Sequence, residues 1–258
     1  MENKMIVKFL QCHIEWENES LNLQRYSQII QDEIGHCDLL VLPETFHCGF
    51  TDTPAHVAQT MDGSVLTWMR QTAMRHQTAL AGSVVIAEKG SHVNRLVFVY
   101  PDGSITWYDK RHLFRMGNEH HRFSPGNRRM VIQYRGWRIL LLVCYDLRFP
   151  VWARNLEDYD MMLIVANWPT PRREVWNVLL KARAIENQSY VVAVNRVGND
   201  LLNRYSGDSV ILDPRGQALV AAPDDQEVLM GTELDLNALR KFRAKFPAFL
   251  DRDGFNVI

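Results

Sequence analysis

The stretch RILLLVCYDLRFP, residues 138–150, places a cysteine at the point where a continuous run of Ile, Leu and Val ends. Such a run is typical of a strand that is buried on both faces of a parallel sheet. Cys144 is followed at once by Tyr145, Asp146 and Arg148, and ligands in open α/β sheets bind at the carboxyl ends of strands. A free cysteine more often serves as a small buried hydrophobe. From its position alone, Cys144 is therefore either a reactive thiol or an inert core residue.

The neighbouring segments predict an α/β fold. Six further apolar runs are predicted strands: 5–12, 38–44, 78–87, 95–101, 161–169 and 190–198. Helical spacing of apolar residues predicts helices over 20–34, 65–75 and 172–188. Pro-Asp-Gly and Pro-Arg-Gly turns predict β-hairpins over 96–109 and 206–222. Strands alternating with helices, with hairpins added, indicate a layered α/β sandwich.

Composition indicates one large globular domain. The chain has 258 residues, of which 47% are hydrophobic, so residues 1–258 can form a single core. Its last part, about 235–258, is amphipathic and is either a surface helix or a segment that packs against a neighbouring subunit. The net charge of -1 gives no support for a nucleic-acid or membrane partner. Four cysteines without paired spacing, and no signal-peptide pattern, predict a cytoplasmic protein.

A cysteine nucleophile needs a base and an oxyanion donor, and histidine is the usual base. None of the nine histidines shows a catalytic or metal-binding spacing. His112, His120 and His121 lie close together in sequence but match no HExxH pattern. We therefore expect a solvated polar loop there and no metal. GxSxG, P-loop and GxGxxG motifs are absent, which removes the usual support for serine hydrolases, NTPases and dinucleotide enzymes.

Two other predicted strands also end in chemically useful groups. Glu44 follows the apolar run 38–43, and Lys110 follows a strand rich in β-branched and aromatic residues. Individually, Glu44 can be a neighbour of a helix N-cap and Lys110 an exposed turn residue. Together with Cys144 they form a more informative set, because burial makes a carboxylate a workable base near neutral pH. A lysine favours the thiolate and can stabilise an oxyanion.

Three motifs carry a resemblance to a known family. LPETF (42–46), YDKRHLF (108–114) and CYDLRFP (144–150) resemble the catalytic motifs of the nitrilase superfamily of carbon–nitrogen hydrolases, in the family's order. The flanking pieces NEHHRFSPG, VANWP and KARAIENQSYVVAVNRVG match as well. The resemblance covers nearly the whole chain. It implies a four-layer α-β-β-α sandwich, a homodimer, and catalysis without a metal or organic cofactor.

The resemblance also implies a role for each motif residue. Cys144 corresponds to the nucleophile that forms a thioester, and Glu44 to the general base and acid. Lys110 corresponds to the residue that stabilises the oxyanion, together with the backbone N–H of Tyr145. Glu119 matches the family's second glutamate, which positions the lysine and the substrate.

Within the superfamily, the motif sequences YDKRHLFRM, CYDLRFPVWARN and VANWP are most similar to those of bacterial ω-amidases. These enzymes hydrolyse the terminal amide of 2-oxoglutaramate and 2-oxosuccinamate, so the implied partner is a small 2-oxo acid amide. Two alternatives are a deaminated-glutathione amidase and another small aliphatic amidase. A non-catalytic binding subunit is a third, but Glu44, Lys110 and Cys144 are all present, which argues against it.

Arg148 supports the choice of a substrate with a carboxylate. Its guanidinium offers a bidentate fork for the carboxylate at the far end of such a substrate. Trp168, after the next strand, is expected to form a wall of the pocket. Alternatively, Arg148 forms a structural ion pair, and the carboxylate is held elsewhere. In that case the ion-pair partner is Asp146 or Asp158, and the substrate carboxylate is bound by Arg172 or Arg173.

Overall fold

Two six-stranded sheets lie face to face at the centre of the computed structural model, which describes residues 3–255. The first sheet consists, in spatial order, of β14 (Val228–Asp235), β1 (Lys4–Gln11), β2 (Leu39–Val41), β3 (Ala79–Glu88), β4 (Ser91–Val99) and β5 (Ile105–Asp109). The second consists of β13 (Ala218–Ala221), β12 (Val210–Leu212), β9 (Tyr190–Val194), β8 (Met161–Val165), β7 (Trp137–Val143) and β6 (Val131–Tyr134). Strands β10 (Val197–Asn199) and β11 (Arg204–Ser206) form a separate hairpin.

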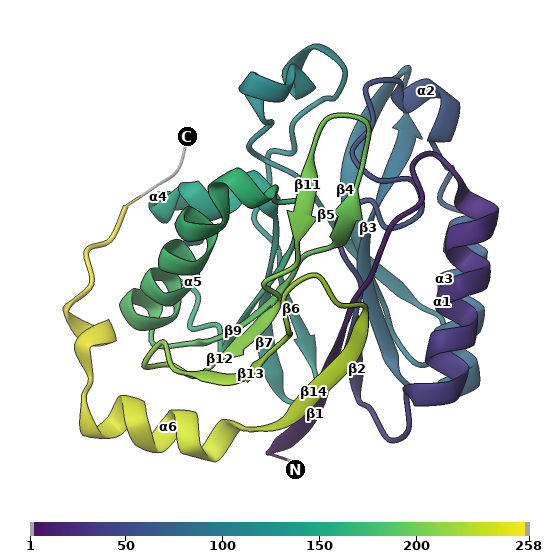
Figure 1. Ribbon diagram of the computed structural model, residues 1–258. Coiled ribbons are helices and arrows are strands. Elements are labelled where there is room, and N and C mark those ends of the chain that lie inside the picture. The colour runs from purple at the N-terminus through teal and green to yellow at the C-terminus, as the bar shows by residue number, and fades with distance from the viewer. Residues whose placement is uncertain (1–2, 256–258) are drawn as a thin grey trace.

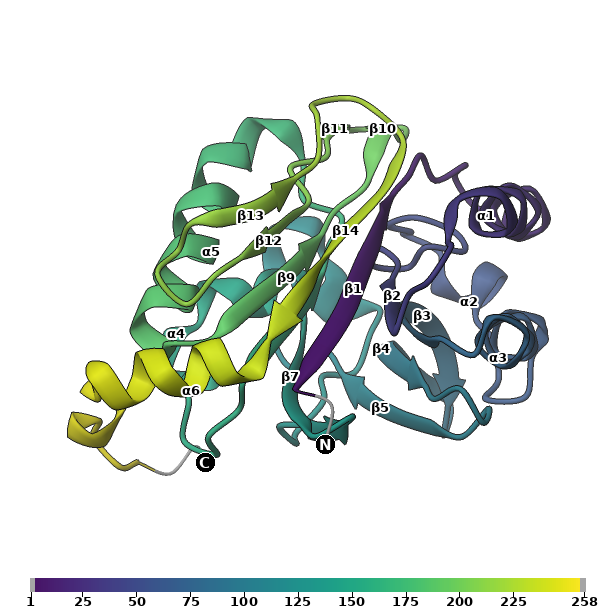
Figure 2. The same cartoon turned by 90° about the horizontal axis from the view of Figure 1, so that it is seen from below.

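Helices cover the outer face of each sheet (Figures 1 and 2). On the first sheet lie α1 (Glu19–Glu33) and α3 (Ser64–His76), with the short α2 (Pro54–Val57) nearby. On the second lie α5 (Arg173–Asn187) and the single turn α4 (Pro150–Ala153). The order helix, sheet, sheet, helix confirms the predicted four-layer α-β-β-α sandwich.

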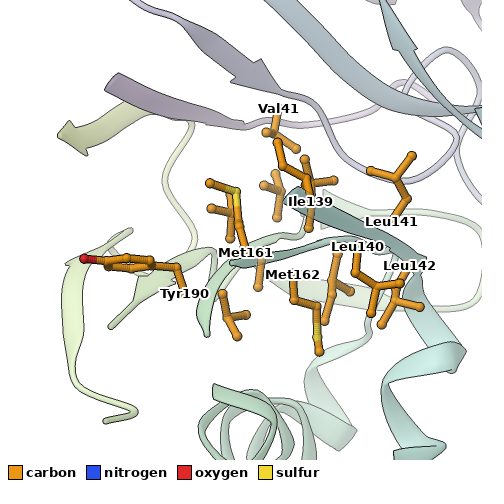
Figure 3. Close-up of a cluster of buried hydrophobic side chains, with 14 of the residues drawn as sticks. Val41, Ile139, Leu140, Leu141, Leu142, Met161, Met162 and Tyr190 are labelled. Atoms are coloured by element: carbon orange, nitrogen blue, oxygen red, sulfur yellow. The ribbon is translucent and has the colours of Figure 1, made fainter. Parts of the chain in front are cut away.

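The core explains why the central strands read as continuous apolar runs. Strand β7 is buried from Ile139 to Val143, because one of its faces meets the other sheet and the opposite face meets the helical layer. Figure 3 shows Ile139 beside Val41 of the first sheet, whereas Leu140 and Leu142 point to the helical side. Burying each such side chain contributes about 1.5–3 kcal/mol to the free energy that stabilises the folded state.

The edges of the sheets depart from the sequence-based prediction. Strands β6 and β14 were not predicted, because edge strands with one solvated side carry a weaker apolar pattern. Strand β14 pairs along its whole length with β1, joining Lys4 to Asp235 across the chain. The predicted strand over 38–44 also ends early, at Val41, and the next three residues leave the sheet and carry Glu44 into the interior.

The C-terminal segment packs on its own chain. Asp235 caps α6 (Leu236–Lys245), and beyond it Phe246 and Phe249 exchange backbone hydrogen bonds with the side chain of Gln188 at 2.8 and 3.2 Å. Phe246 and Leu250 remain largely exposed, so the subunit contact expected for this segment stays a prediction; residues 256–258 lie outside the described range. No helix within residues 3–255 has the length and apolar character needed to cross a membrane.

Candidate active site

The predicted site residues meet where strands of both sheets end. Strand β5 runs in the same direction as β2, because β2 and β3 are parallel and two antiparallel pairings follow. The ends of β2 and β5 therefore bring Glu44 and Lys110 to the same edge of the first sheet. In the second sheet, the parallel strands β7 and β8 end just before Cys144 and shortly before Asn167. The two edges face each other across the sandwich.

A buried ion cluster forms at this junction. Lys110 Nζ donates to Glu44 Oε1 and to Glu119 Oε1, each at 2.9 Å. The side chains of all three residues are at most 1% exposed. Glu44 is therefore not a helix-cap residue and Lys110 is not an exposed turn lysine. Burying three ionisable groups costs desolvation free energy. Buried clusters of this kind are typical of functional sites.

Two asparagines complete the surroundings of Glu44. Asn94 Nδ2 donates to Glu44 Oε1 at 2.8 Å, and the backbone N–H of Asn167 donates to Oε2 at 2.7 Å. Asn167 Nδ2 also donates to the backbone oxygen of Glu44 at 3.0 Å. Both carboxylate oxygens are thus fixed, one of them from the opposite sheet. Sequence reasoning missed both asparagines: VANWP was recognised as a motif without a role for Asn167, and Asn94 carries no local signal.

Cys144 occupies a strained turn at the end of β7. Its φ of 46° lies in the left-handed region, which residues other than glycine rarely adopt and which is concentrated at functional sites. The short 3-10 helix η3 (Cys144–Arg148) begins here. The N–H of Tyr145 lies in its first turn, where a helix leaves N–H groups without an intrahelical acceptor. Thiol and free donor are thus presented at the same point.

The electrostatics of the cluster keep Cys144 protonated at rest. Burial raises the pKa of the Cys144 thiol well above its ordinary value, and the negative charge of Glu44 raises it further. Lys110 lowers the pKa of this thiol, as the sequence suggests, but does not outweigh the other effects. Burial would lower the pKa of Lys110, yet Glu119 and Glu44 hold it well above its ordinary range. The resting site thus pairs a neutral thiol with an ammonium group, and attack requires a base.

Glu119 and Gly126 fix the lysine from the loop that follows β5. The pKa of Glu119 is raised by burial, against the opposing effect of Lys110. Its second oxygen accepts the backbone N–H of Phe114 at 2.6 Å. Gly126 donates its N–H to the backbone oxygen of Lys110 at 2.8 Å, and a Cβ there would lie 2.1 Å from the backbone oxygen of Asp109. Only glycine allows this close approach.

Asp146 ties the two strand ends together. It is fully buried, and its Oδ2 accepts the Tyr108 hydroxyl at 2.8 Å and the Val143 N–H at 3.0 Å. Its Oδ1 accepts the backbone N–H of His112 at 2.9 Å and lies 2.7 Å from the ring Nδ1 of the same residue. The ring of His112 stacks on Phe149. The sequence predicted a solvated polar loop around His112. For this residue the prediction is wrong, because His112 links β5 to β7 through Asp146.

A cavity of about 540 Å³ opens onto the thiol. Lys110, Cys144 and Tyr145 lie on its wall, together with Trp168. Further out, its rim carries acidic and exposed apolar residues: Asp52, Asp200, Met116, Leu201 and Leu202. The size and mixed lining suit a small organic ligand.

Arg148 also lines this cavity, and its guanidinium lies 5.1 Å from the centre of the Trp168 ring. Within residues 3–255, no ion pair joins Arg148 to Asp146, which bonds to the groups described above, or to Asp158, which pairs with Arg252 at 2.8 Å. Among residues 3–255, no group of three or more His, Cys, Asp or Glu side chains is placed to hold a metal ion.

Comparison with known proteins agrees with this geometry. The family model described as "Carbon-nitrogen hydrolase" matches residues 7–244. The chain is 45% identical to omega-amidase YafV of Escherichia coli K12, over 97% of this chain and 98% of that protein. It is 34% identical to the 2-oxoglutaramate amidase of Bacillus subtilis, over 96% and 97%. The CN-hydrolase superfamily protein XC1258 of Xanthomonas campestris superposes with a TM-score of 0.96 at 42% identity, with 99% of each chain covered. The chain therefore belongs to the carbon–nitrogen hydrolase family.

Proposed function

We propose that this enzyme is an ω-amidase that hydrolyses the terminal amide of small 2-oxo acid amides such as 2-oxoglutaramate. The observation that carries the proposal is the buried Glu44–Lys110–Glu119 cluster beside Cys144. Lys110 and Cys144 line a cavity that Arg148 also lines. The named activities of the Escherichia coli and Bacillus subtilis relatives support the same substrate class.

In the proposed mechanism, Glu44 takes the proton of Cys144 as the sulfur attacks the amide carbon. Lys110 and the N–H of Tyr145 stabilise the oxyanion that develops on the carbonyl oxygen. Glu44 then returns the proton to the leaving nitrogen, the C–N bond breaks, and ammonia departs from a thioester. Water attacks this thioester, with Glu44 again acting as base, and the acid and the free thiol are released.

The protonated resting thiol fits this sequence of steps. Because the pKa of Cys144 is raised, the thiol has to give its proton to a base before or as it attacks, and Glu44 is the neighbouring carboxylate, which raises that pKa through a hydrogen bond and its charge. Glu119 takes part through Lys110, which it positions. An oxyanion donor in such a water-excluded site is worth about 3–4 kcal/mol in the transition state.

We further propose that the functional unit is a homodimer formed through the helical face of α4 and α5. Val151, Val178 and Ile185 expose 56, 55 and 55% of their surface there, which is high for large apolar side chains. Val178 and Ile185 are seven residues apart and therefore share one face of α5. A cytoplasmic location, and the lack of a nucleic-acid or membrane partner, remain predictions from sequence.

Ammonia release from a panel of amides tests the activity. We expect hydrolysis of 2-oxoglutaramate and 2-oxosuccinamate to exceed that of butyramide and of deaminated glutathione. Mass spectrometry should find the acyl adduct on Cys144 and on none of the buried residues Cys12, Cys37 and Cys48. Cys144→Ala should abolish turnover, whereas activity that survives in this variant would rule the mechanism out.

Arg148→Ala tests recognition of the carboxylate within the same panel. It should lower kcat/KM for amides that carry a carboxylate by an amount equivalent to about 2–5 kcal/mol. Butyramide, which has no carboxylate, should be affected far less. Arg148→Lys should restore only part of the loss, because an ammonium keeps the charge without the planar fork. An equal loss on neutral and charged amides would make Arg148 a structural residue.

A further inference from the structure

A second guanidinium lies on the wall of the catalytic cavity. Arg172, in the turn between β8 and α5, lines the cavity together with Arg148. Its guanidinium carbon is 5.1 Å from the centre of the Phe114 ring, as that of Arg148 is from Trp168. The indole N–H of Trp168 donates to the backbone oxygen of Arg172 at 2.7 Å. The aromatic wall of the cavity thus holds both planar cations, with Trp168 in contact with each residue.

Neither cation has a counter-ion in the part of the chain that the structure describes. Within residues 3–255, no carboxylate pairs with Arg148 or Arg172. The next residue behaves differently, because Arg173 pairs with Asp208 and Asp224 and does not line the cavity. Arg148 and Arg172 are only partly exposed, and a cation removed from water is costly until it is paired. Two unpaired guanidiniums in one cavity favour an anionic ligand with several acceptor oxygens.

We infer that Arg172 is a second specificity-determining residue, which binds the acid end of the substrate together with Arg148. This inference rests on the proposed ω-amidase function. A 2-oxo acid ends in a carboxylate next to a keto oxygen, which offers more acceptors than one guanidinium fork can use. The cation–π contact with Phe114 limits where the Arg172 guanidinium can lie, so less freedom is lost when the ligand binds.

The inference predicts an effect on binding rather than on chemistry. Arg172 contacts the ring of Phe114, whereas Glu119 is held by the backbone N–H of that residue. Removing the guanidinium therefore leaves in place the hydrogen bonds that Phe114 N–H and Lys110 Nζ donate to Glu119. Turnover of a bound substrate should change little, while the KM for substrates with an acid end should rise.

The experiment compares Arg172→Ala with the matched control Arg173→Ala, which removes the neighbouring arginine that is already paired. Arg172→Ala should raise the KM for 2-oxoglutaramate about tenfold or more and leave the KM for butyramide unchanged. The value of kcat should stay within about threefold for both amides. Arg172→Lys should recover part of the affinity, and Arg173→Ala should match the wild type. Competitive inhibition by the product 2-oxoglutarate should weaken in Arg172→Ala to the same extent as substrate binding.

Two results would overturn the inference: an unchanged KM for 2-oxoglutaramate, or an equal rise for butyramide. Failure of the proposed function shows itself separately, in the wild type, as a preference for butyramide over 2-oxoglutaramate. In that case, inhibition by 2-oxoglutarate still tests the inference. Equal inhibition of the wild type and Arg172→Ala would then refute it.

Discussion

At the scale of single residues, the surroundings of Cys144 keep the proposed nucleophile in its protonated, less reactive form. Cys144 adopts a left-handed backbone conformation and keeps its proton, because burial and Glu44 together outweigh Lys110. The same carboxylate that raises the thiol pKa is the proposed acceptor of its proton. A thiol kept neutral in this way is protected from adventitious oxidation and alkylation, which require the thiolate.

The pKa of Cys144 should respond in opposite directions to the removal of its two charged neighbours. Glu44→Gln should lower this pKa, because the carboxylate stabilises the protonated thiol. Lys110→Met should raise it, because the ammonium stabilises the thiolate. The pH dependence of iodoacetamide alkylation, followed at Cys144 by mass spectrometry, measures both shifts. At a fixed alkaline pH, alkylation should therefore be faster than wild type in Glu44→Gln and slower in Lys110→Met. Shifts in the same direction would contradict this view of the cluster.

At the scale of elements, the site depends on where strands stop. Glu44, Lys110 and Cys144 could be predicted from sequence because each follows a predicted strand, and a strand end is a local feature. Asn94 and Asn167 could not be predicted, since their contacts with Glu44 arise only when β4 and the turn after β8 pack against the same carboxylate. Local patterns identify the ends of elements but not the partners that tertiary packing supplies.

The link between β5 and β7 through Asp146 gives a second prediction. Asp146→Ala leaves the Tyr108 hydroxyl and the N–H groups of Val143 and His112 without their acceptor. A buried donor left unpaired costs about 1–3 kcal/mol, so the free energy of unfolding should fall by about 3 kcal/mol or more. Urea denaturation followed by circular dichroism measures this change.

Asp158→Ala provides the matched control for that measurement. Asp158 is paired with one cation, Arg252, and its side chain is 60% exposed. Exposed pairs contribute about 0–1 kcal/mol, so this variant should unfold at nearly the urea concentration of the wild type. A similar small loss in Asp146→Ala would mean that the two strand ends are held together by other contacts.

At the scale of the whole molecule, both helical layers expose apolar side chains, with fractions of 55% for Val178 and Ile185 against 38% for Leu21 and 51% for Met74. The α5 face exposes Val178 and Ile185, whereas α1 and α3 expose Leu21 and Met74. The fold class and the layer order were predictable from apolar runs and motifs. The edge pairing of β14 with β1 was not, since it joins residues from the two ends of the chain.

The homodimer proposal predicts a mass of about twice 30.0 kDa in sedimentation equilibrium. Because Val178 and Ile185 would be buried at the interface, Val178→Glu combined with Ile185→Glu should shift the protein to the monomer. Leu21→Glu with Met74→Glu, on the opposite helical face, serves as control and should leave the dimer intact. A monomeric wild type would refute the proposal.

The supply of site residues by both sheets has a consequence for how the chain folds. Glu44 and Lys110 come from the first sheet, and Cys144 and Asn167 from the second, so neither half holds a working set until the two have docked. Contacts between residues far apart in sequence form slowly. The first sheet is complete only when its last strand, β14, pairs with β1. After dilution from denaturant, the far-ultraviolet circular dichroism of the secondary structure should therefore return before amide hydrolysis does. Enzymatic activity would then time the last step of folding, and a simultaneous return of both signals would contradict this order.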